Sequence, residues 1–379
     1  MRRLLALALV AAIATLAGCA GAANPAPAET CAQAAQSLAS LEIASDARAT
    51  TGPSTACLSS HGVAAIDDDT APGLPVTMTD AEGREVEITD VSRILPVDIS
   101  GTIAATVFGL GLGDQVVGRD SSTDFAGTED LPVVTKSGHS LNAEAILELA
   151  PTVMLTDTTI GPKEVRQQLR DAGIAVVVVS SDRRLDTVDD LVREIADALG
   201  VPSRGDALVE RINADIEDAQ AEVAAAASAA AAGSSAAEGG VSRSSDRPRM
   251  LFLYVRGNAN IYYIFGRDSG ADSLIDAVGG IDVATEIGWE GMKPMTAEAL
   301  VAAQPDVLVM MTDGLASVGG IDGLLERIPA LKQTPAGEHR RVVDMADSEI
   351  LSFGPRSAEI IRALARAVYA PAPAAPPSS

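Results

Sequence analysis

Histidine and cysteine, the most common zinc ligands, are scarce in this sequence. Its 379 residues include only three histidines and three cysteines, and one of the histidines, His61, lies in a segment with no sustained hydrophobic pattern. A catalytic zinc site needs about three such ligands close together. The sequence also lacks a phosphate-binding loop of the Gly-x-x-x-x-Gly-Lys type, a Gly-x-Ser-x-Gly nucleophile elbow and a His-Glu-x-x-His helix. We therefore predict that the protein is not an enzyme.

Basic and aromatic residues are also few. Lys and Arg total 28 against 52 for Asp and Glu, which gives a formal net charge of -24. Proteins that bind nucleic acid neutralise its phosphates with Lys and Arg, so we predict no nucleic-acid partner. The acidic surplus suits a soluble, exported body. Only 3% of the residues are aromatic, so each tyrosine in an apolar strand is worth considering as a functional residue.

No apolar run reaches the length of about 20 residues that a membrane-spanning helix needs. The run at residues 4–16 follows Arg2 and Arg3 and is shorter than that, so it predicts a signal peptide over residues 1–18. The small residues before Cys19 resemble a bacterial lipobox. This pattern predicts that lipid is attached to Cys19 and that the mature protein is extracytoplasmic and anchored to the membrane.

The other two cysteines, Cys31 and Cys57, lie in a segment rich in Ala, Pro, Ser, Thr and Asp. Because this composition lacks periodicity, we predict a flexible spacer over residues 19–73. In an oxidising compartment, a pair of cysteines is more often a disulfide than a metal site. The sequence thus predicts a Cys31–Cys57 disulfide that closes a loop inside the tether.

Apolar strands alternate with helices through the rest of the chain. This alternation is typical of parallel sheets covered on both faces. We predict an α/β fold of two similar lobes with mostly parallel sheets, at residues 74–203 and 249–370. The helical pattern at 204–232, at about 1.5 Å per residue, gives a rod over about 40 Å long that suits a strut between the lobes. A low-complexity loop (233–248) and a disordered tail (371–379) complete the chain.

A short motif occurs twice. Glu144 and Glu298 each follow an alanine at the start of an apolar helix, and Pro151 and Pro305 stop these helices before an apolar strand. The spacing is the same for both pairs, since 298 − 144 = 154 and 305 − 151 = 154. An acidic residue near a helix N-terminus is favoured by the helix dipole, but the dipole does not explain one such residue in each lobe. We predict that the two glutamates occupy equivalent places.

These features resemble the substrate-binding lipoproteins of ABC importers, in the class whose two α/β lobes are joined by one rigid helix. The repeat, the Gly-Leu-Gly-Asp-Gln-Val-Val-Gly run at 111–118 and the long helix carry the resemblance, which covers residues 74–369. Members of this class bind cobalamin, ferric siderophores or haem between the lobes and deliver it to a permease. The resemblance implies that Glu144 and Glu298 dock onto the permease, and that the protein works as a monomer.

Within this class the sequence is most similar to haem-binding members of the HmuT type. The matching segments are Thr-Lys-Ser-Gly-His-Ser at 135–140 and Leu-Tyr-Val-Arg-Gly at 253–257. The resemblance implies that His139 and Tyr254 ligate the iron of haem b, the transported ligand in iron uptake, with Arg256 beside the tyrosine. Imidazole and phenolate are both known haem ligands. On a strand, residues two apart share a face, so Phe252 lies on the side of Tyr254 and Arg256.

Several alternatives stay open from the sequence. Arg256 could hydrogen-bond the phenolate or pair with a haem propionate. Tyr262 and Tyr263 are rivals to Tyr254, and Met292 is a possible sulfur ligand. The cargo could instead be a ferric siderophore or cobalamin. The fold could also host a metal or tetrapyrrole enzyme, or the protein could store or sense haem.

Overall fold

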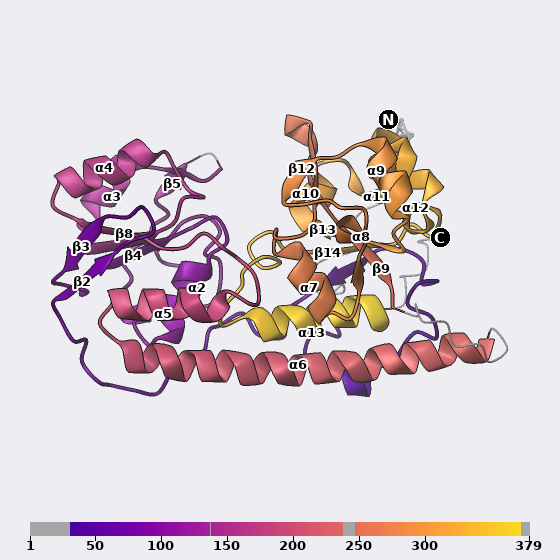
Figure 1. Cartoon of the computed structure of the whole chain (residues 1–379), viewed down its shortest axis with the longest axis horizontal. Coiled ribbons are helices and arrows are strands. Elements are labelled where there is room, and N and C mark those ends of the chain that lie inside the picture. The colour runs from indigo at the N-terminus through magenta and orange to yellow at the C-terminus, as the bar shows by residue number, and fades with distance from the viewer. Residues whose placement is uncertain (1–30, 137, 238–246, 373–379) are drawn as a thin grey trace, which may run out of the picture.

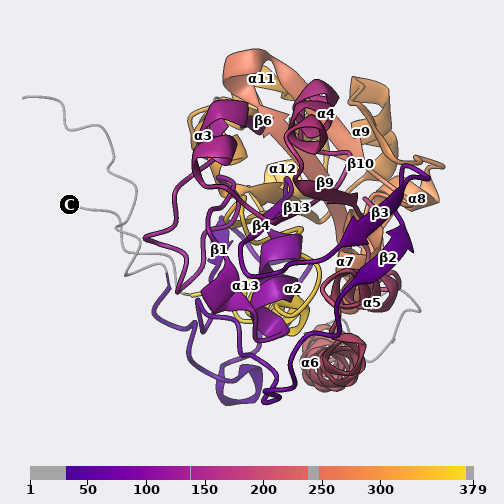
Figure 2. The same cartoon turned by 90° about the vertical axis from the view of Figure 1, so that its left-hand side faces the viewer.

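The computed structural model describes residues 31–136, 138–237 and 247–372. The predicted signal peptide, Cys19, most of the low-complexity loop and most of the tail lie outside these residues. Over the described ranges, no helix combines the length and the apolar character needed to cross a bilayer. Figure 1 shows two lobes side by side above one long helix, α6, and Figure 2 shows that helix end-on beneath them.

The first lobe is built on a parallel sheet with the order β4-β7-β8, at Ile94–Val97, Val153–Thr156 and Ala175–Val178. Nearly every residue of these strands is buried, because helices cover both faces. Helices α3 (Ala143–Glu148) and α4 (Lys163–Asp171) cover one face, and α2 (Thr102–Gly109) and α5 (Val188–Ala198) cover the other (Figure 1). Two small antiparallel pairs complete this lobe: β2–β3 (Val76–Thr79, Glu85–Ile88) and β5–β6 (Thr135–Lys136, Ser140–Leu141).

The second lobe is built on a seven-stranded sheet with the order β1-β14-β13-β9-β10-β12, and β11 pairs with β9. Its strands are β1 (Ser54–Ala56), β9 (Arg249–Arg256), β10 (Ile261–Phe265), β11 (Ile281–Asp282), β12 (Met292–Pro294), β13 (Val307–Met311) and β14 (Val342–Met345). Its helices are α7 (Ala271–Ala277), α8 (Val283–Glu286), α9 (Ala297–Ala303), α10 (Thr312–Ala316), α11 (Gly320–Arg327), α12 (Pro335–Glu338) and α13 (Ser357–Tyr369). The β9–β10 and β10–β12 pairs are antiparallel, and the other pairs are parallel. The predicted fold of two α/β lobes with mostly parallel sheets is confirmed.

The connecting helix α6 runs from Pro202 to Ala237, which is longer than the predicted 204–232. Its 36 residues span about 54 Å at 1.5 Å per residue. Buried side chains recur along it every three or four residues, at Leu208, Ile212, Ile216, Ala219, Val223, Ala226 and Ala230. This spacing gives one apolar stripe, which packs on α5 of the first lobe and α13 of the second.

The described part of the predicted spacer is folded onto the body, so the prediction of a flexible segment is wrong for residues 31–73. We call these residues the strap. Cys31 and Cys57 form the predicted disulfide, and Leu38 and Leu58 are buried. Strand β1 of the strap forms the edge of the second-lobe sheet beside β14. The buried guanidinium of Arg341 donates hydrogen bonds to the strap at the Gly52 carbonyl and the Ser54 hydroxyl.

The internal repeat is present in the backbone. Ala150 and Gln304, which precede the two prolines, both have φ of 44°, a left-handed conformation that is uncommon for residues other than glycine. The two strands that follow lie at equivalent places in their sheets, because β7 lies between the parallel strands β4 and β8, and β13 lies between the parallel strands β9 and β14. One detail differs, because Thr296 caps its helix through its side chain whereas Asn142 makes no such bond.

Candidate functional site

His139 lies in the turn between β5 and β6, so the turn joins two short strands before helix α3 begins. Gly138, with φ of 71°, allows the chain to reverse there. The Nδ1 atom of His139 is buried and has no hydrogen-bond partner among the described residues. Burial lowers the pKa of His139, and the positive charge of Arg256 lowers it further, whereas Asp98 opposes this shift. At neutral pH the side chain is therefore neutral imidazole, the form that ligates metals.

Arg256 ends strand β9 of the second lobe, so its effect on the pKa of His139 is an electrostatic effect of one lobe on the other. On β9 and β10, Tyr254 lies opposite Tyr263 and Phe252 lies opposite Phe265. Paired residues on antiparallel strands project on the same face. Their rings pack together, with centroids 6.5 Å apart for Tyr254 and Tyr263 and 5.6 Å apart for Tyr254 and Phe265.

The pairing of β9, β10 and β12 shows which of the candidate residues lie on the same face of the sheet as Tyr254. Tyr262 lies opposite Val255 and packs against the other core of the second lobe, so it projects from the opposite face of the sheet from Tyr254. Phe252 has 0% exposure, so it supports Tyr254 from within the core and has no free surface for a ligand. Met292 on β12 lies opposite Phe265 and is 62% exposed. Met292 and Tyr263 therefore share the face of Tyr254.

Arg256 lies over the ring of Tyr254, with its Cζ atom 4.5 Å from the ring centroid. This is the geometry of a cation–π contact. Its Nη2 atom donates to Asp347 Oδ1 at 2.5 Å, and its Nη1 atom donates to the Val255 carbonyl at 3.0 Å. The sequence reasoning missed Asp347. A usable pattern was present, because Asp347 follows closely after β14, and groups at the carboxyl ends of parallel strands gather at one edge.

The same edge of the first-lobe sheet carries a buried acidic cluster that was also missed. Asp98 follows β4 and Asp157 follows β7, and Arg183 pairs with both, at 3.4 and 2.6 Å. Asp120 Oδ2 accepts a hydrogen bond from the backbone N–H of Asp98. Burial, and then the charge of Asp98, raise the pKa of Asp120 to about 7. Since Asp98 also acts on the pKa of His139, the cluster lies within electrostatic reach of the candidate ligand residue.

The segment that carries Arg183 also touches the second lobe. Arg184 pairs with Asp268 at 3.3 Å, and the backbone N–H of Leu185 donates to the Ser273 hydroxyl at 3.4 Å. Gly270 lies so close that a Cβ atom there would be 2.2 Å from the Arg183 carbonyl oxygen. The two lobes are therefore in direct contact beside the acidic cluster.

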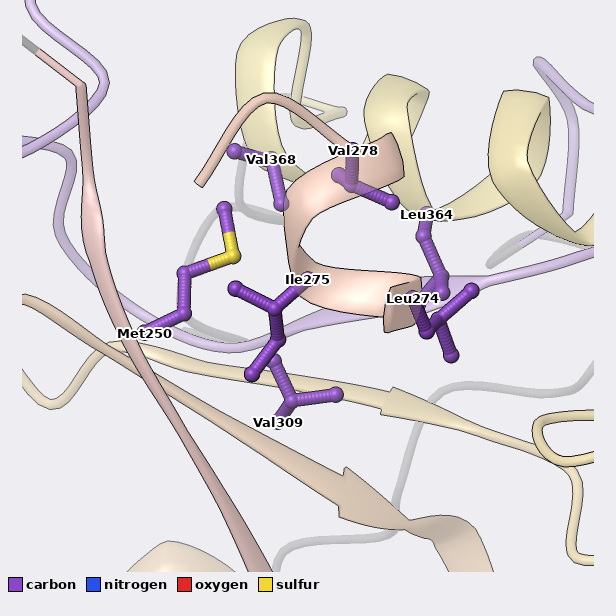
Figure 3. A pocket seen from close by; sticks show the side chains of 7 residues that line it. All are labelled: Met250, Leu274, Ile275, Val278, Val309, Leu364 and Val368. Atoms are coloured by element: carbon purple, nitrogen blue, oxygen red, sulfur yellow. The ribbon is translucent and has the colours of Figure 1, made fainter. Parts of the chain in front are cut away.

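A small cavity of about 10 Å³ lies within the second lobe (Figure 3). Its walls are entirely apolar and come from β9, β13, α7 and α13: Met250, Leu274, Ile275, Val278, Val309, Leu364 and Val368. A cavity of this size holds one water molecule at most. It is a gap in core packing and not a ligand site. Across the described ranges, no three His, Cys, Asp or Glu side chains gather to hold a metal ion.

The two predicted docking glutamates are both exposed. Glu144 lies in the first turn of α3 and Glu298 in the first turn of α9. Figure 1 shows α3 and α9 on the same side of the molecule, away from α6. The two carboxylates are thus available to one partner that approaches both lobes from that side.

Comparison with known proteins gives consistent results. The family model described as periplasmic binding protein matches residues 97–349. The crystal structure of the haem-binding protein HmuT is 41% identical, with a TM-score of 0.76, and the match covers 86% of this chain and 99% of that one. Structures of HmuT with one histidine, one tyrosine or one arginine replaced by alanine also match, and the replaced tyrosine and arginine are two positions apart.

Two relatives are more distant in sequence. YvrC of Bacillus subtilis, an uncharacterised ABC transporter substrate-binding lipoprotein, is 26% identical over 299 residues, which are 78% of this chain and 86% of YvrC. A cobalamin-binding protein of Halobacterium salinarum is 26% identical over 307 residues, which are 80% of this chain and 76% of that protein.

Proposed function

Because this chain belongs to the periplasmic binding protein family, we propose that it captures haem outside the cell and delivers it to an ABC permease. The observation that carries this proposal is the guanidinium of Arg256 over the ring of Tyr254 in the second lobe. The charge of Arg256 also reaches His139 of the first lobe and lowers its pKa. Tyr254 and Arg256 are two positions apart, as are the tyrosine and arginine replaced in HmuT. Binding and release need no catalysis.

In the proposed complex, His139 and Tyr254 ligate the haem iron from opposite faces. Imidazole, as in His139, is a haem ligand, and the phenolate of Tyr254 is an anionic ligand that favours ferric iron. A cation beside a phenolate stabilises its charge, which is the role of Arg256. Tyr263 and Met292 share the face of Tyr254 and provide contact surface for the porphyrin. We leave Tyr262 out of this set because it projects from the opposite face.

An absorption titration with hemin tests this proposal on the chain from Ala20 onward, which keeps every described residue. We expect one-to-one binding with a shifted Soret band, and changes of different kinds in His139→Ala and Tyr254→Phe. Tyr262→Phe is the matched control, because it removes a hydroxyl from the other face of the same sheet, and its spectrum should equal that of the wild type. The absence of stoichiometric hemin binding by the wild-type chain would overturn the haem assignment.

We further propose that Glu144 and Glu298 dock onto the permease and that lipid on Cys19 anchors the protein. The two glutamates are exposed, and their helices, α3 and α9, lie on one side of the molecule (Figure 1), as a docking pair requires. The double variant Glu144→Ala/Glu298→Ala should bind hemin normally but lose uptake in cells. Glu148→Ala removes an exposed carboxylate from the same helix as Glu144 and should leave uptake unchanged. Normal uptake by the double variant would exclude this docking role.

Cobalamin is the second candidate cargo, because the relative from Halobacterium salinarum is named a cobalamin-binding protein. The same chain titrated with cobalamin separates the two. Saturable binding of cobalamin without binding of hemin would replace haem as the cargo while leaving the family assignment intact.

A further inference from the structure

We propose that Asp347 is a positioning residue that holds Arg256 over the ring of Tyr254, so that Arg256 serves the tyrosine and not a haem propionate. This inference rests on the proposed function, in which Tyr254 is an iron ligand. It decides between the two roles of Arg256 that the sequence leaves open. Asp347 itself touches neither Tyr254 nor the cargo in this proposal.

Both oxygens of Asp347 are engaged. Oδ1 accepts the hydrogen bond from Arg256 Nη2 at 2.5 Å, and Oδ2 accepts one from the backbone N–H of Asp313 at 2.9 Å. Asp313 lies in the first turn of helix α10, so the carboxylate is fixed to a backbone element at one end and to the guanidinium at the other. Hydrogen bonds between charged groups are about twice as strong as neutral ones.

The guanidinium of Arg256 is held from three further directions. Nη1 donates to the Val255 carbonyl, and Nη2 lies 3.5 Å from the sulfur of Met311. Helix α10 approaches closely at Gly314, where a Cβ atom would lie 3.2 Å from Nη1 and 2.7 Å from the Val255 oxygen. These contacts hold the guanidinium over the ring of Tyr254.

The same contacts engage three of the five N–H donors of Arg256. Both terminal nitrogens already donate to protein acceptors, and one of these acceptors is a carboxylate. A propionate that took the place of Asp347 would have to break an existing ion pair of the same type. The contacts of Arg256 therefore hold its positive charge against the ring of Tyr254.

A double-mutant cycle on hemin affinity tests the inference with Asp347→Ala, Arg256→Ala and the double variant. We expect Asp347→Ala to weaken hemin binding about tenfold, as for loss of a charge-assisted hydrogen bond. If Asp347 acts through Arg256, the double variant binds as Arg256→Ala does. Losses that multiply would show a separate role for Asp347, and unchanged binding in Asp347→Ala would show no role; both outcomes overturn the inference.

The matched control is Asp322→Ala, which removes the carboxylate of an exposed Asp–Arg pair in the same lobe, 2.7 Å from Arg340. Its hemin affinity should stay within twofold of the wild type. If Asp347→Ala does not fold, Asp347→Asn removes the charge with a side chain of the same shape and takes its place in the cycle.

A second measurement uses the protein without hemin, so its outcome tests the role of Asp347 independently of whether haem is the cargo. In an NMR spectrum of the ligand-free chain, the guanidinium protons of Arg256, identified by their loss in Arg256→Ala, should exchange slowly with water. They should exchange much faster in Asp347→Ala and stay slow in Asp322→Ala. Equal exchange in all three proteins would show that Asp347 does not hold Arg256, whatever the cargo is.

Discussion

Removal of the strap should destabilise the second lobe strongly. Leu38 and Leu58 are 1% and 3% exposed, and burying a leucine side chain contributes about 1.5–3 kcal/mol. The two leucines together give about 3–6 kcal/mol, before the pairing of β1 with β14 is counted. Domains are typically stable by only about 5–15 kcal/mol. A chain that starts at residue 74 should therefore unfold at a much lower denaturant concentration than the chain from Ala20.

The fluorescence of the single tryptophan can be used to follow unfolding of the second lobe. Trp289 lies in the second lobe and its Nε1–H donates to the Ile264 carbonyl, so its fluorescence follows unfolding of the lobe that the strap packs on. In urea titrations, Leu38→Ala and Leu58→Ala should each cost about 2–4 kcal/mol. Gln36→Ala, at an exposed strap position, should cost less than about 0.5 kcal/mol. If the truncated chain and both leucine variants keep the wild-type midpoint, the strap is the plain spacer that its composition suggests, and the reasoning is refuted.

Two further predictions concern the contact region of the lobes. Asp120 has a pKa of about 7 against 3.8 for the ordinary group. Because the folded-state value is the higher one, its contribution to the free energy of unfolding is complete below about pH 4 and is lost as the pH rises through about 7, by up to about 4 kcal/mol. Urea titrations from pH 4.5 to 7.5 should show this loss in the wild type but not in Asp120→Asn, and parallel curves would contradict it. Gly270→Ala should cost about 2–4 kcal/mol, because its Cβ would meet the Arg183 carbonyl and its φ is 88°. Gly83→Ala has a similar φ of 77° with nothing within 4 Å, so it should cost only about 1 kcal/mol, and equal costs would show that contact with Arg183 is unimportant.

The two-lobe architecture could be predicted because it depends on local patterns. Apolar strands alternate with amphipathic helices, and the helix–proline–strand motif recurs at one spacing, which the matching conformations of Ala150 and Gln304 bear out. The strap could not be predicted in this way. Its buried residues, such as Leu38 and Leu58, are isolated apolar positions in a polar segment, and only the tertiary structure provides the surfaces that cover them.

In the candidate site, too, some residues could be predicted from the sequence and others depended on the tertiary structure. His139 and Tyr254 stand out by residue type and by the resemblance. The choice between Tyr262 and Tyr263 depended on the register of the hairpin, which pairs Arg256 with Ile261 across a four-residue connection and so places Tyr263 beside Tyr254. The contact between Arg256 and Asp347 joins residues 91 positions apart. The position of Asp347 just after an apolar strand marks it as a candidate for this edge of the sheet, but only the tertiary structure pairs it with Arg256.

The folded strap also limits the length of the free linker between the body and the proposed lipid anchor. A spacer that was free up to residue 73 would let the body range far from the membrane. With residues 31–73 fixed to the body, only 31 − 19 = 12 steps separate Cys31 from the proposed lipid on Cys19. At 3.3–3.6 Å per residue, these steps reach about 40 Å at most. Anchoring at Cys19 would then hold the body within one molecular diameter of the bilayer. Confinement of this kind raises the effective concentration of the body near a permease in the same membrane, so even weak docking through exposed glutamates would keep the carrier engaged.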